Sequence, residues 1–310
     1  MLPTYESHDT WRRYQDHFPA GLRISAGSTP REEYWRWRGL DVHLDRLAVP
    51  TAPLKIIVLH GVGAYGRLMS PAAVLAQRYG YETLAPDLPG YGLTRVPRSE
   101  LTYQLWIDCV RDLIAAERAR DSRPIVLFGV SLGGLVAYQV AGRDVAGLIA
   151  TTLADPRECA VRIAFSRNAV LGTAGLWLLQ RLRFLTDALP LPIGVVSRMK
   201  HISNKPGLSA LVMRDPLGGG NWVPARFLRT LMSTPPAIEP EQFTACPVLL
   251  AHPGVDRMTD IALSRRFFDR LAAPKRMVVL DGASHMPTEH PGIDQLEVAV
   301  LEFLRTLHAN

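Results

Sequence analysis

A serine framed by glycines is the strongest candidate for a chemical role in this chain. Gly129-Val130-Ser131-Leu132-Gly133 has the form G-x-S-x-G, follows the apolar segment 125–128 and precedes an apolar helical pattern. A nucleophilic serine needs a sharp strand-to-helix turn that exposes its Oγ, and flanking glycines leave room for the neighbouring backbone. The pattern predicts that Ser131 is a nucleophile; the alternative is an incidental serine in a glycine-rich turn.

The best candidate for a base is His285, because a serine hydroxyl is a weak nucleophile without one. It lies in the segment 281–287, between the last predicted strand and the last predicted helix. That loop falls at the same edge of the predicted sheet as Ser131. His252, at the end of the preceding strand, is the closest rival, but chain order and loop position favour His285.

An acidic partner for the histidine is also present. Asp256 follows the predicted strand 248–251, on a loop beside that of His285, and completes the chain order Ser, Asp, His. A carboxylate in this position fixes the imidazole tautomer and stabilises its charged form. Asp155 is a rival because it ends an earlier strand, and Asp260 is a weaker rival that suits a helix cap.

Two backbone amides are expected to form an oxyanion hole. Leu132 follows the nucleophile at a helix N-terminus, and Val62 lies in the loop His60-Gly61-Val62-Gly63 after the strand 54–59. His60 itself is predicted to be a structural hydrogen-bonding residue.

The same loop contains a competing motif, since Gly61 to Gly66 reads G-x-G-x-x-G and Asp87 ends the next strand. This is the pattern of a dinucleotide-binding turn. Such a site needs a helix that begins within the glycines, so that its N-terminus meets the pyrophosphate. Ser70-Pro71 predicts a later helix start, with Ser70 as N-cap, which argues against nucleotide binding.

These residues require a parallel sheet that brings their loops to one edge. A hairpin is predicted over 33–47, and after it apolar strands alternate with helices, which indicates right-handed crossovers and a doubly wound α/β fold. The expected strands are 54–59, 83–85, 125–128, 145–153, 248–251 and 276–280. The expected helices are 71–79, 103–118, 132–141, 261–271 and 292–307.

The alternation stops at Asp155-Pro156 and resumes after Pro240. The intervening segment is helical, basic and rich in Pro and Gly. We therefore expect a core formed by residues 1–155 and 241–310, with residues 156–240 inserted after the sixth strand as a lid. Long connections of this kind are usually functional.

Taken together, the motifs resemble those of the α/β-hydrolase superfamily, in the same order. The resemblance covers 54–307 apart from the insertion, and within the superfamily the chain looks most like the monoacylglycerol lipase and lysophospholipase group. The motifs concerned are His60-Gly61, Asp87 to Gly92, Gly129 to Gly134, Asp215-Pro216-Leu217, Asp256-Arg257 and Gly282 to Pro287.

This resemblance implies a serine hydrolase that cleaves carboxylic esters through an acyl-enzyme, with no metal or organic cofactor. The same triad would also serve a thioesterase, a lactonase, a carbon–carbon hydrolase or an acyltransferase. A ligand-binding receptor on a hydrolase fold is the non-enzymatic alternative.

The inserted segment is expected to select the substrate. It has eleven Arg or Lys against four Asp or Glu, a net charge of +7, whereas the whole chain has +6. Its apolar stretch 169–179 contains Leu176 and Trp177, which we predict to bind a lipid-like or medium-to-long acyl substrate together with Gly63. Contact with an anionic membrane surface is a second expectation, because basic surfaces attract anions.

Composition limits the remaining possibilities. The 310 residues are ordinary for a globular protein, and no stretch is long and apolar enough to span a bilayer. Three cysteines without close spacing predict neither a disulfide framework nor a metal site. No aromatic and basic stripe of the nucleic-acid-binding type occurs. With no recognisable signal peptide, a cytoplasmic protein is expected.

Overall fold

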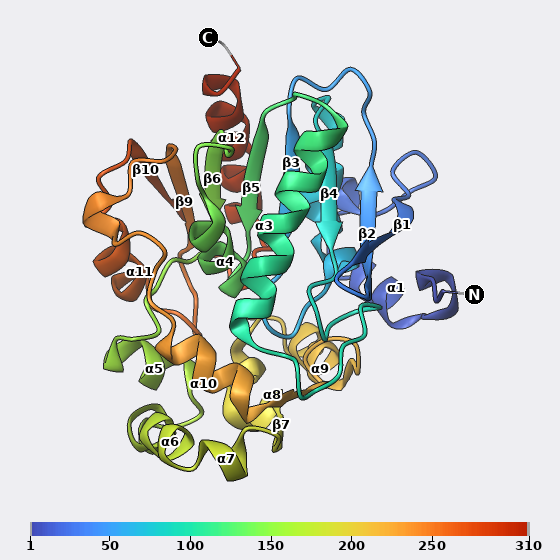
Figure 1. Cartoon of the computed structure of the whole chain (residues 1–310). Coiled ribbons are helices and arrows are strands. Elements are labelled where there is room, and N and C mark those ends of the chain that lie inside the picture. The colour runs from blue at the N-terminus through green and yellow to red at the C-terminus, as the bar shows by residue number, and fades with distance from the viewer. Residues whose placement is uncertain (1, 309–310) are drawn as a thin grey trace.

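The predicted strands form one eight-stranded sheet in the computed structural model, which describes residues 2–308 (Figure 1). The order across the sheet is β1-β2-β4-β3-β5-β6-β9-β10. The strands are β1 (Arg31–Trp37), β2 (Leu40–Leu47), β3 (Lys55–Leu59), β4 (Glu82–Pro86), β5 (Ile125–Gly129), β6 (Gly147–Ala150), β9 (Val248–Pro253) and β10 (Lys275–Leu280).

The sheet is antiparallel at one edge and parallel elsewhere. β1 and β2 form the predicted hairpin, and β2 pairs antiparallel with β4. Each later pairing, from β4 through β10, is parallel. The carboxyl ends of the parallel strands therefore share one edge, which is where the predicted chemical groups lie.

Helices cover both faces, as a doubly wound sheet requires. α3 (Tyr103–Arg120) lies in front of the sheet in Figure 1 and contacts α4 (Leu132–Val140). α12 (Gly292–Thr306) lies behind and packs on β9 and β10. α2 (Ser70–Arg78) packs on β4, and α11 (Ile261–Phe268) packs on β9.

The apolar sequences of the inner strands are explained by their burial. Every residue of β3, β5 and β6 is buried. Strands of a parallel sheet are covered on both faces, so a continuous apolar run fits them better than alternation does. The doubly wound fold predicted from the sequence is confirmed.

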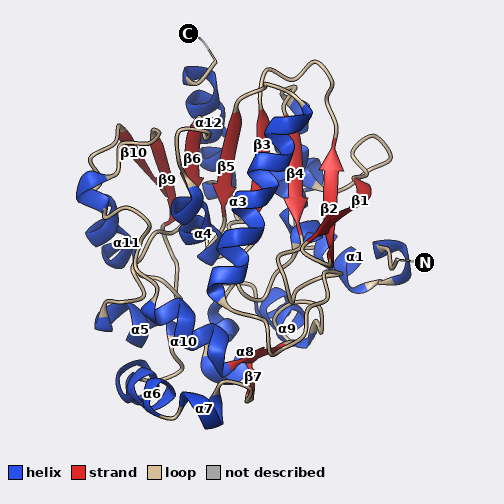
Figure 2. Ribbon diagram, in the orientation of Figure 1, coloured by secondary structure: helices blue, strands red, loops and turns tan. Residues whose placement is uncertain are grey.

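The inserted segment (residues 156–240) leaves the sheet after β6, the sixth strand, and lies beyond the carboxyl ends of the strands (Figure 2). Beside its helices it holds a two-stranded antiparallel sheet, which the sequence did not predict. Its elements are α5 (Cys159–Phe165), α6 (Ala169–Arg181), α7 (Arg183–Thr186), β7 (Pro190–Pro192), α8 (Ile193–Val196), α9 (Pro206–Arg214), β8 (Trp222–Pro224) and α10 (Ala225–Ser233).

The start of α2 differs from the prediction. A 3-10 turn, η3 (Gly66–Met69), leads into the helix, and Met69 occupies the N-cap position. Ser70 is already helical, and its buried hydroxyl has no hydrogen-bond partner among residues 2–308. The 3-10 turn brings the first helical turn forward, so Ser70 is not the cap.

The N-terminal segment also packs against the core. The 3-10 turns η1 (Tyr5–Ser7) and η2 (Ala20–Leu22) flank the short helix α1 (Thr10–Gln15). The aromatic rings of Tyr5 and Tyr14 are fully buried. Among the described residues, no helix has the length and apolar character needed to cross a bilayer.

Candidate active site

Ser131 occupies a strained turn between β5 and α4. Its φ is 55° and its ψ is −128°, a backbone conformation that a residue with a side chain rarely adopts. The Ser131 N–H donates to Thr151 Oγ1 at 3.0 Å, which helps to hold the turn. A Cβ on Gly133 would overlap the carbonyl of Leu59, so only glycine lets α4 start this close to β3.

The three residues predicted from the sequence form one hydrogen-bonded row. His285 Nε2 lies 2.7 Å from Ser131 Oγ, and His285 Nδ1 lies 2.7 Å from Asp256 Oδ2. The side chains of His285 and Asp256 are 3% and 1% exposed, so water scarcely competes for these contacts. Chemically, a histidine in this position can take the hydroxyl proton while the carboxylate stabilises the resulting imidazolium.

Local hydrogen bonds keep Asp256 ionised. Burial raises the pKa of this carboxyl, but the charge and hydrogen bond of His285 lower it, as do two backbone N–H groups, and the net pKa lies below its usual value. Those N–H groups belong to Met258 and Thr259, which donate to Oδ1 at 2.7 and 2.9 Å. The second oxygen therefore remains directed at His285.

The rival residues are engaged elsewhere. Asp155 is bound by Arg157, whose Nη2 lies 2.6 Å from Oδ2. Asp260 accepts from Ala262 N at 2.8 Å and caps α11, as predicted. His252 is fully buried at the end of β9, where its Nδ1 lies 2.9 Å from the carbonyl oxygen of Pro253.

The loop after β3 lies against the nucleophile. A Cβ on Gly61 would sit 2.9 Å from Ser131 Cβ and 3.2 Å from Leu132 N, so the glycine allows direct approach. Val62 follows it and is half-exposed. Within residues 2–308, neither the Val62 amide nor the Leu132 amide has a hydrogen-bond partner, which leaves both free to bind an oxyanion.

His60 is a structural group, as the sequence predicted. Burial lowers the pKa of His60 to about 4, so the ring is neutral. Its Nδ1 donates to Gly61 O at 2.8 Å, and its Nε2 accepts from Leu88 N at 2.9 Å. This ring joins the loop after β3 to the loop after β4.

A buried network that the sequence did not predict ties this loop to the inserted segment. Tyr65 Oη donates to Asp215 Oδ2 at 2.9 Å, and Tyr14 Oη donates to the same oxygen at 3.1 Å. Leu217 N donates to Asp215 Oδ1 at 3.0 Å. Because Tyr65 belongs to the loop that begins at Gly61, one carboxylate connects that loop, the N-terminal segment and the inserted segment.

The residues predicted to bind substrate lie in different surroundings. Gly63 is buried under the inserted segment, where a Cβ would sit 2.8 Å from Met199 Cε. Leu176 is half-buried on α6, and the neighbouring Trp177 is 60% exposed. α6 packs on α5 and α10 rather than on the sheet.

One cluster among the described residues has the geometry of metal ligands. Ligand atoms of Glu32, His43 and Asp45 lie within 4.8 Å of one another. Arg67 already occupies the cluster, with Nη2 2.8 Å from Asp45 Oδ1 and 3.2 Å from Glu32 Oε1. A guanidinium placed between two carboxylates supplies the positive charge that a cation would otherwise bring.

Sequence comparison identifies the family to which the fold belongs. Residues 56–293 match the alpha/beta hydrolase family, a span that contains Ser131, Asp256 and His285. The chain belongs to this family. Its membership agrees with the order of the strands in the sheet.

One relative and two solved structures resemble this alpha/beta hydrolase at low sequence identity. Phospholipase YtpA from Bacillus subtilis is 24% identical over 221 residues, which cover 70% of this chain and 82% of that protein. A soluble variant of monoglyceride lipase from Saccharomyces cerevisiae, solved with a substrate analogue, has a TM-score of 0.73 at 14% identity, covering 94% and 98% of the two chains. Monoacylglycerol lipase from Paleococcus ferrophilus has a TM-score of 0.67 at 21% identity, covering 86% and 99%. These structural likenesses establish the fold.

Proposed function

We propose that this alpha/beta hydrolase cleaves carboxylic esters through an acyl-enzyme formed on Ser131. The observation that carries the proposal is the row Ser131–His285–Asp256, with both hydrogen bonds at 2.7 Å. The strained turn at Ser131 supports it, because such strain is retained at sites where it exposes a reactive atom. Relatives named as a phospholipase and as monoacylglycerol lipases favour esters as the substrate class.

In the first half of the reaction Ser131 Oγ attacks the ester carbonyl carbon and His285 Nε2 takes the hydroxyl proton. Asp256 stabilises the imidazolium formed at that moment. The tetrahedral intermediate then expels the alcohol, which receives the proton from His285. In the second half a water molecule, deprotonated by His285, attacks the acyl carbonyl carbon. The bond to Ser131 Oγ then breaks, His285 returns the proton to Ser131 Oγ, and the carboxylic acid leaves.

The oxyanion of each tetrahedral intermediate would be bound by the amides of Val62 and Leu132. Both amides are free of other partners within the described chain, and Gly61 brings the Val62 loop against the nucleophile. Donors of this kind, fixed before the reaction, stabilise the charge as it develops. The proposed mechanism uses only these side chains and amides.

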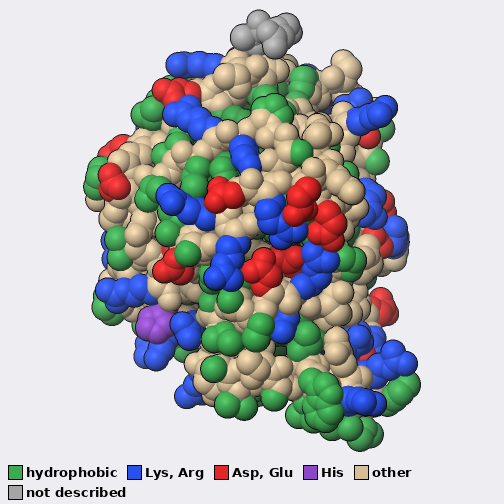
Figure 3. Space-filling view, turned by 90° about the vertical axis from the view of Figure 1, so that its left-hand side faces the viewer, with side chains coloured by type: hydrophobic (Ala, Val, Ile, Leu, Met, Phe, Trp, Pro, Cys, Tyr) green, Lys and Arg blue, Asp and Glu red, His purple; other side chains and the backbone are tan. Residues whose placement is uncertain are grey.

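A lipid-like substrate suits the surface of the inserted segment, which we propose to be the lid. Apolar side chains gather at this lower end of the molecule with Lys and Arg beside them (Figure 3). On α7, Phe184 is 87% and Leu185 is 76% exposed, and Arg183 lies next to them. Such a patch is suited to an anionic lipid surface, since apolar burial and charge attraction act together there.

The remaining predictions from the sequence are part of this proposal as well. The division into a core of 1–155 and 241–310 with a lid of 156–240 stays a prediction. So do the substrate contacts of Gly63, Leu176 and Trp177 and the cytoplasmic location.

Hydrolysis of p-nitrophenyl esters by the wild type and by Ser131→Ala tests the proposal. We expect turnover by the wild type and loss of at least about 10³-fold in kcat in the variant. Circular dichroism of the two proteins provides the control for folding. Equal turnover by both proteins would contradict the serine mechanism.

A further inference from the structure

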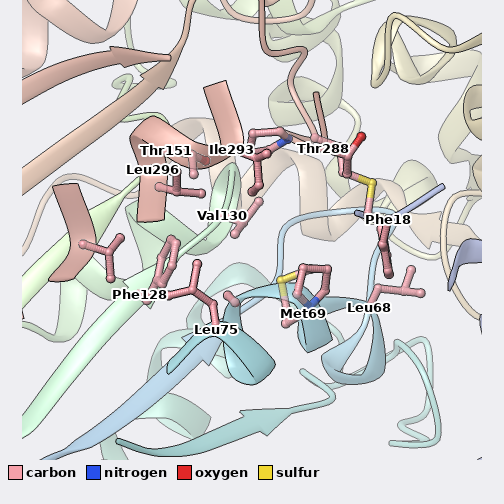
Figure 4. A pocket seen from close by; sticks show the side chains of 15 residues that line it. Phe18, Leu68, Met69, Leu75, Phe128, Val130, Thr151, Thr288, Ile293 and Leu296 are labelled. Atoms are coloured by element: carbon pink, nitrogen blue, oxygen red, sulfur yellow. The ribbon is translucent and has the colours of Figure 1, made fainter. Parts of the chain in front are cut away.

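Two cavities of the molecule differ in the chemistry of their walls. The pocket between α2 and α12, drawn in Figure 4, is lined by apolar side chains such as Leu75, Phe128 and Leu296. The other cavity lies where the loop between β4 and α3 meets the inserted segment below the sheet (Figure 1), and its volume is about 140 Å³. Arg95 and Arg98 lie in its wall, which contains no Asp or Glu of the described residues. We call it the arginine cavity.

The two guanidinium groups of the arginine cavity are free to bind a ligand. Within residues 2–308, neither Arg95 nor Arg98 forms a salt bridge or a side-chain hydrogen bond, and both side chains are exposed. Arg226 on α10, in contrast, is paired with Asp187. The backbone N–H groups of Arg95, Val96 and Arg98 also lack a partner within the described chain. A concave wall that carries positive charge and free donors attracts anions.

The walls of the arginine cavity are fixed by their own hydrogen bonds. In the loop after β4, Gly90 N donates to Thr94 O at 3.1 Å. The inserted segment is joined to this loop twice, since Asn221 Nδ2 donates to Gly90 O at 2.9 Å and Gly92 N donates to Leu217 O at 3.1 Å. A ligand therefore has to order little more than the two arginine side chains, which lowers the cost of binding.

The donors and the size of the arginine cavity favour a phosphate group. A guanidinium fork matches the oxygens of a phosphate, and the three terminal oxygens of a phosphate monoester accept from two arginines at once. The volume is close to that of a cavity of about 150 Å³ that holds benzene, so a phosphate leaves room for a few carbons. Leu101, Leu217 and Trp222 supply apolar wall for those carbons.

We propose that the arginine cavity binds the phosphate group of a small phosphate monoester through Arg95 and Arg98. A soluble ester such as glycerol 3-phosphate and the head group of phosphatidic acid present the same group. None of Ser131, His285 and Asp256 lines this cavity, so the inference does not depend on ester hydrolysis. Because the ligand touches the loop and the inserted segment together, its binding stabilises their contact.

Titration calorimetry with glycerol 3-phosphate and with inorganic phosphate, at fixed salt, tests the proposal. Two exposed charge-assisted contacts predict a Kd of about 0.1 to 1 mM for the wild type. Arg95→Gln and Arg98→Gln should each weaken binding about tenfold or more, and the double variant should not bind. The matched control is Arg167→Gln with Arg214→Gln, which removes the same charge from exposed arginines outside the cavity and should change Kd less than about twofold.

Two further measurements locate the ligand. Trp222 lines the cavity, so phosphate should change the tryptophan fluorescence of the wild type but not that of Trp222→Phe. At about ten times Kd, the ligand should raise Tm by about 2 °C or more in the wild type and in the control pair, and not in the double arginine variant. Circular dichroism checks that the variants fold.

Vesicles of phosphatidylcholine with and without phosphatidic acid distinguish the two sources of the phosphate. A loss of vesicle binding in the double arginine variant, beyond that of the control pair, assigns the lipid head group. A loss confined to glycerol 3-phosphate assigns a soluble ester. Equal affinity of the wild type and the double variant, equal weakening in the control pair, or no binding at about 10 mM phosphate would overturn the proposal.

Discussion

Tyr65 and Asp215 lie 150 positions apart, yet the Tyr65 hydroxyl donates to Asp215 Oδ2 at 2.9 Å in a fully buried contact. Tyr65 ends the loop that carries Val62, and Asp215 lies in the inserted segment. The turn after Asp215 also packs on this loop, since a Cβ on Gly218 would sit 2.7 Å from Gly63 O. The position of the Val62 amide, the proposed oxyanion donor, thus depends on how the inserted segment packs against its loop.

Tyr65→Phe should therefore affect turnover more than substrate binding. Removing a whole oxyanion donor costs about 10²- to 10³-fold in kcat, so loosening the loop should cost about tenfold, with KM nearly unchanged. Tyr14→Phe is the matched control, because it removes a hydroxyl from the same carboxylate oxygen without touching the loop. Steady-state kinetics of both variants decide the matter, and an equal kcat in the two would count against a positioning role.

Asp256→Asn should lower kcat by about 10³- to 10⁴-fold while the protein stays folded. An amide cannot stabilise the imidazolium and favours the wrong tautomer of His285. Asp155→Asn is the control, since its carboxylate is bound to Arg157. That change should cost about 1–3 kcal/mol of stability and leave kcat within about twofold. A larger kcat loss in the Asp155 variant would reassign the acid.

The stability of the fold should decrease with pH above neutrality because of His43. Burial lowers the pKa of His43, but Asp87, Glu32 and Asp45 raise it to about 10. His43 therefore keeps its proton in the folded protein to about pH 10, whereas the unfolded chain loses it near 6.5. The contribution of protonated His43 to the stability of the folded protein is complete below pH 6.5 and is lost as the pH rises through 10.

Between pH 6.5 and 10 the free energy of unfolding should fall by up to about 1.4 kcal/mol per pH unit. Urea unfolding at several pH values from 7 to 9.5 measures it. His43→Gln should be less stable at pH 7 but show a flatter dependence. Parallel slopes for the two proteins would mean that His43 is not the group responsible.

The exposed patch on α7 should bind anionic vesicles. Phe184→Ser combined with Leu185→Ser should reduce co-sedimentation with phosphatidylglycerol vesicles by about tenfold or more, because burying each side chain contributes about 1.5 kcal/mol or more. The substitutions lie far outside the triad, so hydrolysis of dissolved acetate ester should not change. Binding that survives both substitutions would place the membrane contact elsewhere.

Local sequence signals were sufficient to predict the fold and the meeting of Ser131, His285 and Asp256 in one hydrogen-bonded row. Ser131 lies in a glycine motif whose geometry only a strand-to-helix turn satisfies, and Asp256 and His285 each follow an apolar strand. Parallel strands share one edge, so three loops distant in sequence were expected to meet.

Contacts between distant polar residues were not predictable in the same way. Nothing around Tyr14, Tyr65 or Asp215 in the sequence signals that the three meet, because no periodicity or spacing links them. The same holds for Thr151, which follows the neighbouring strand β6 and whose hydroxyl accepts a hydrogen bond from the Ser131 amide. The prediction of the start of α2 was wrong for a different reason. A 3-10 turn has no apolar period that the sequence pattern could reveal.

Covalent labelling is the sharpest test of whether Ser131 Oγ is the nucleophile. The wild type, His285→Ala and Ser131→Ala would be treated with a fluorophosphonate and measured by intact and peptide mass spectrometry. We expect one phosphonyl adduct on the Ser131 peptide of the wild type, much slower labelling in His285→Ala, and no adduct in Ser131→Ala. An adduct of equal extent in Ser131→Ala, or a wild-type adduct on another residue, would contradict it.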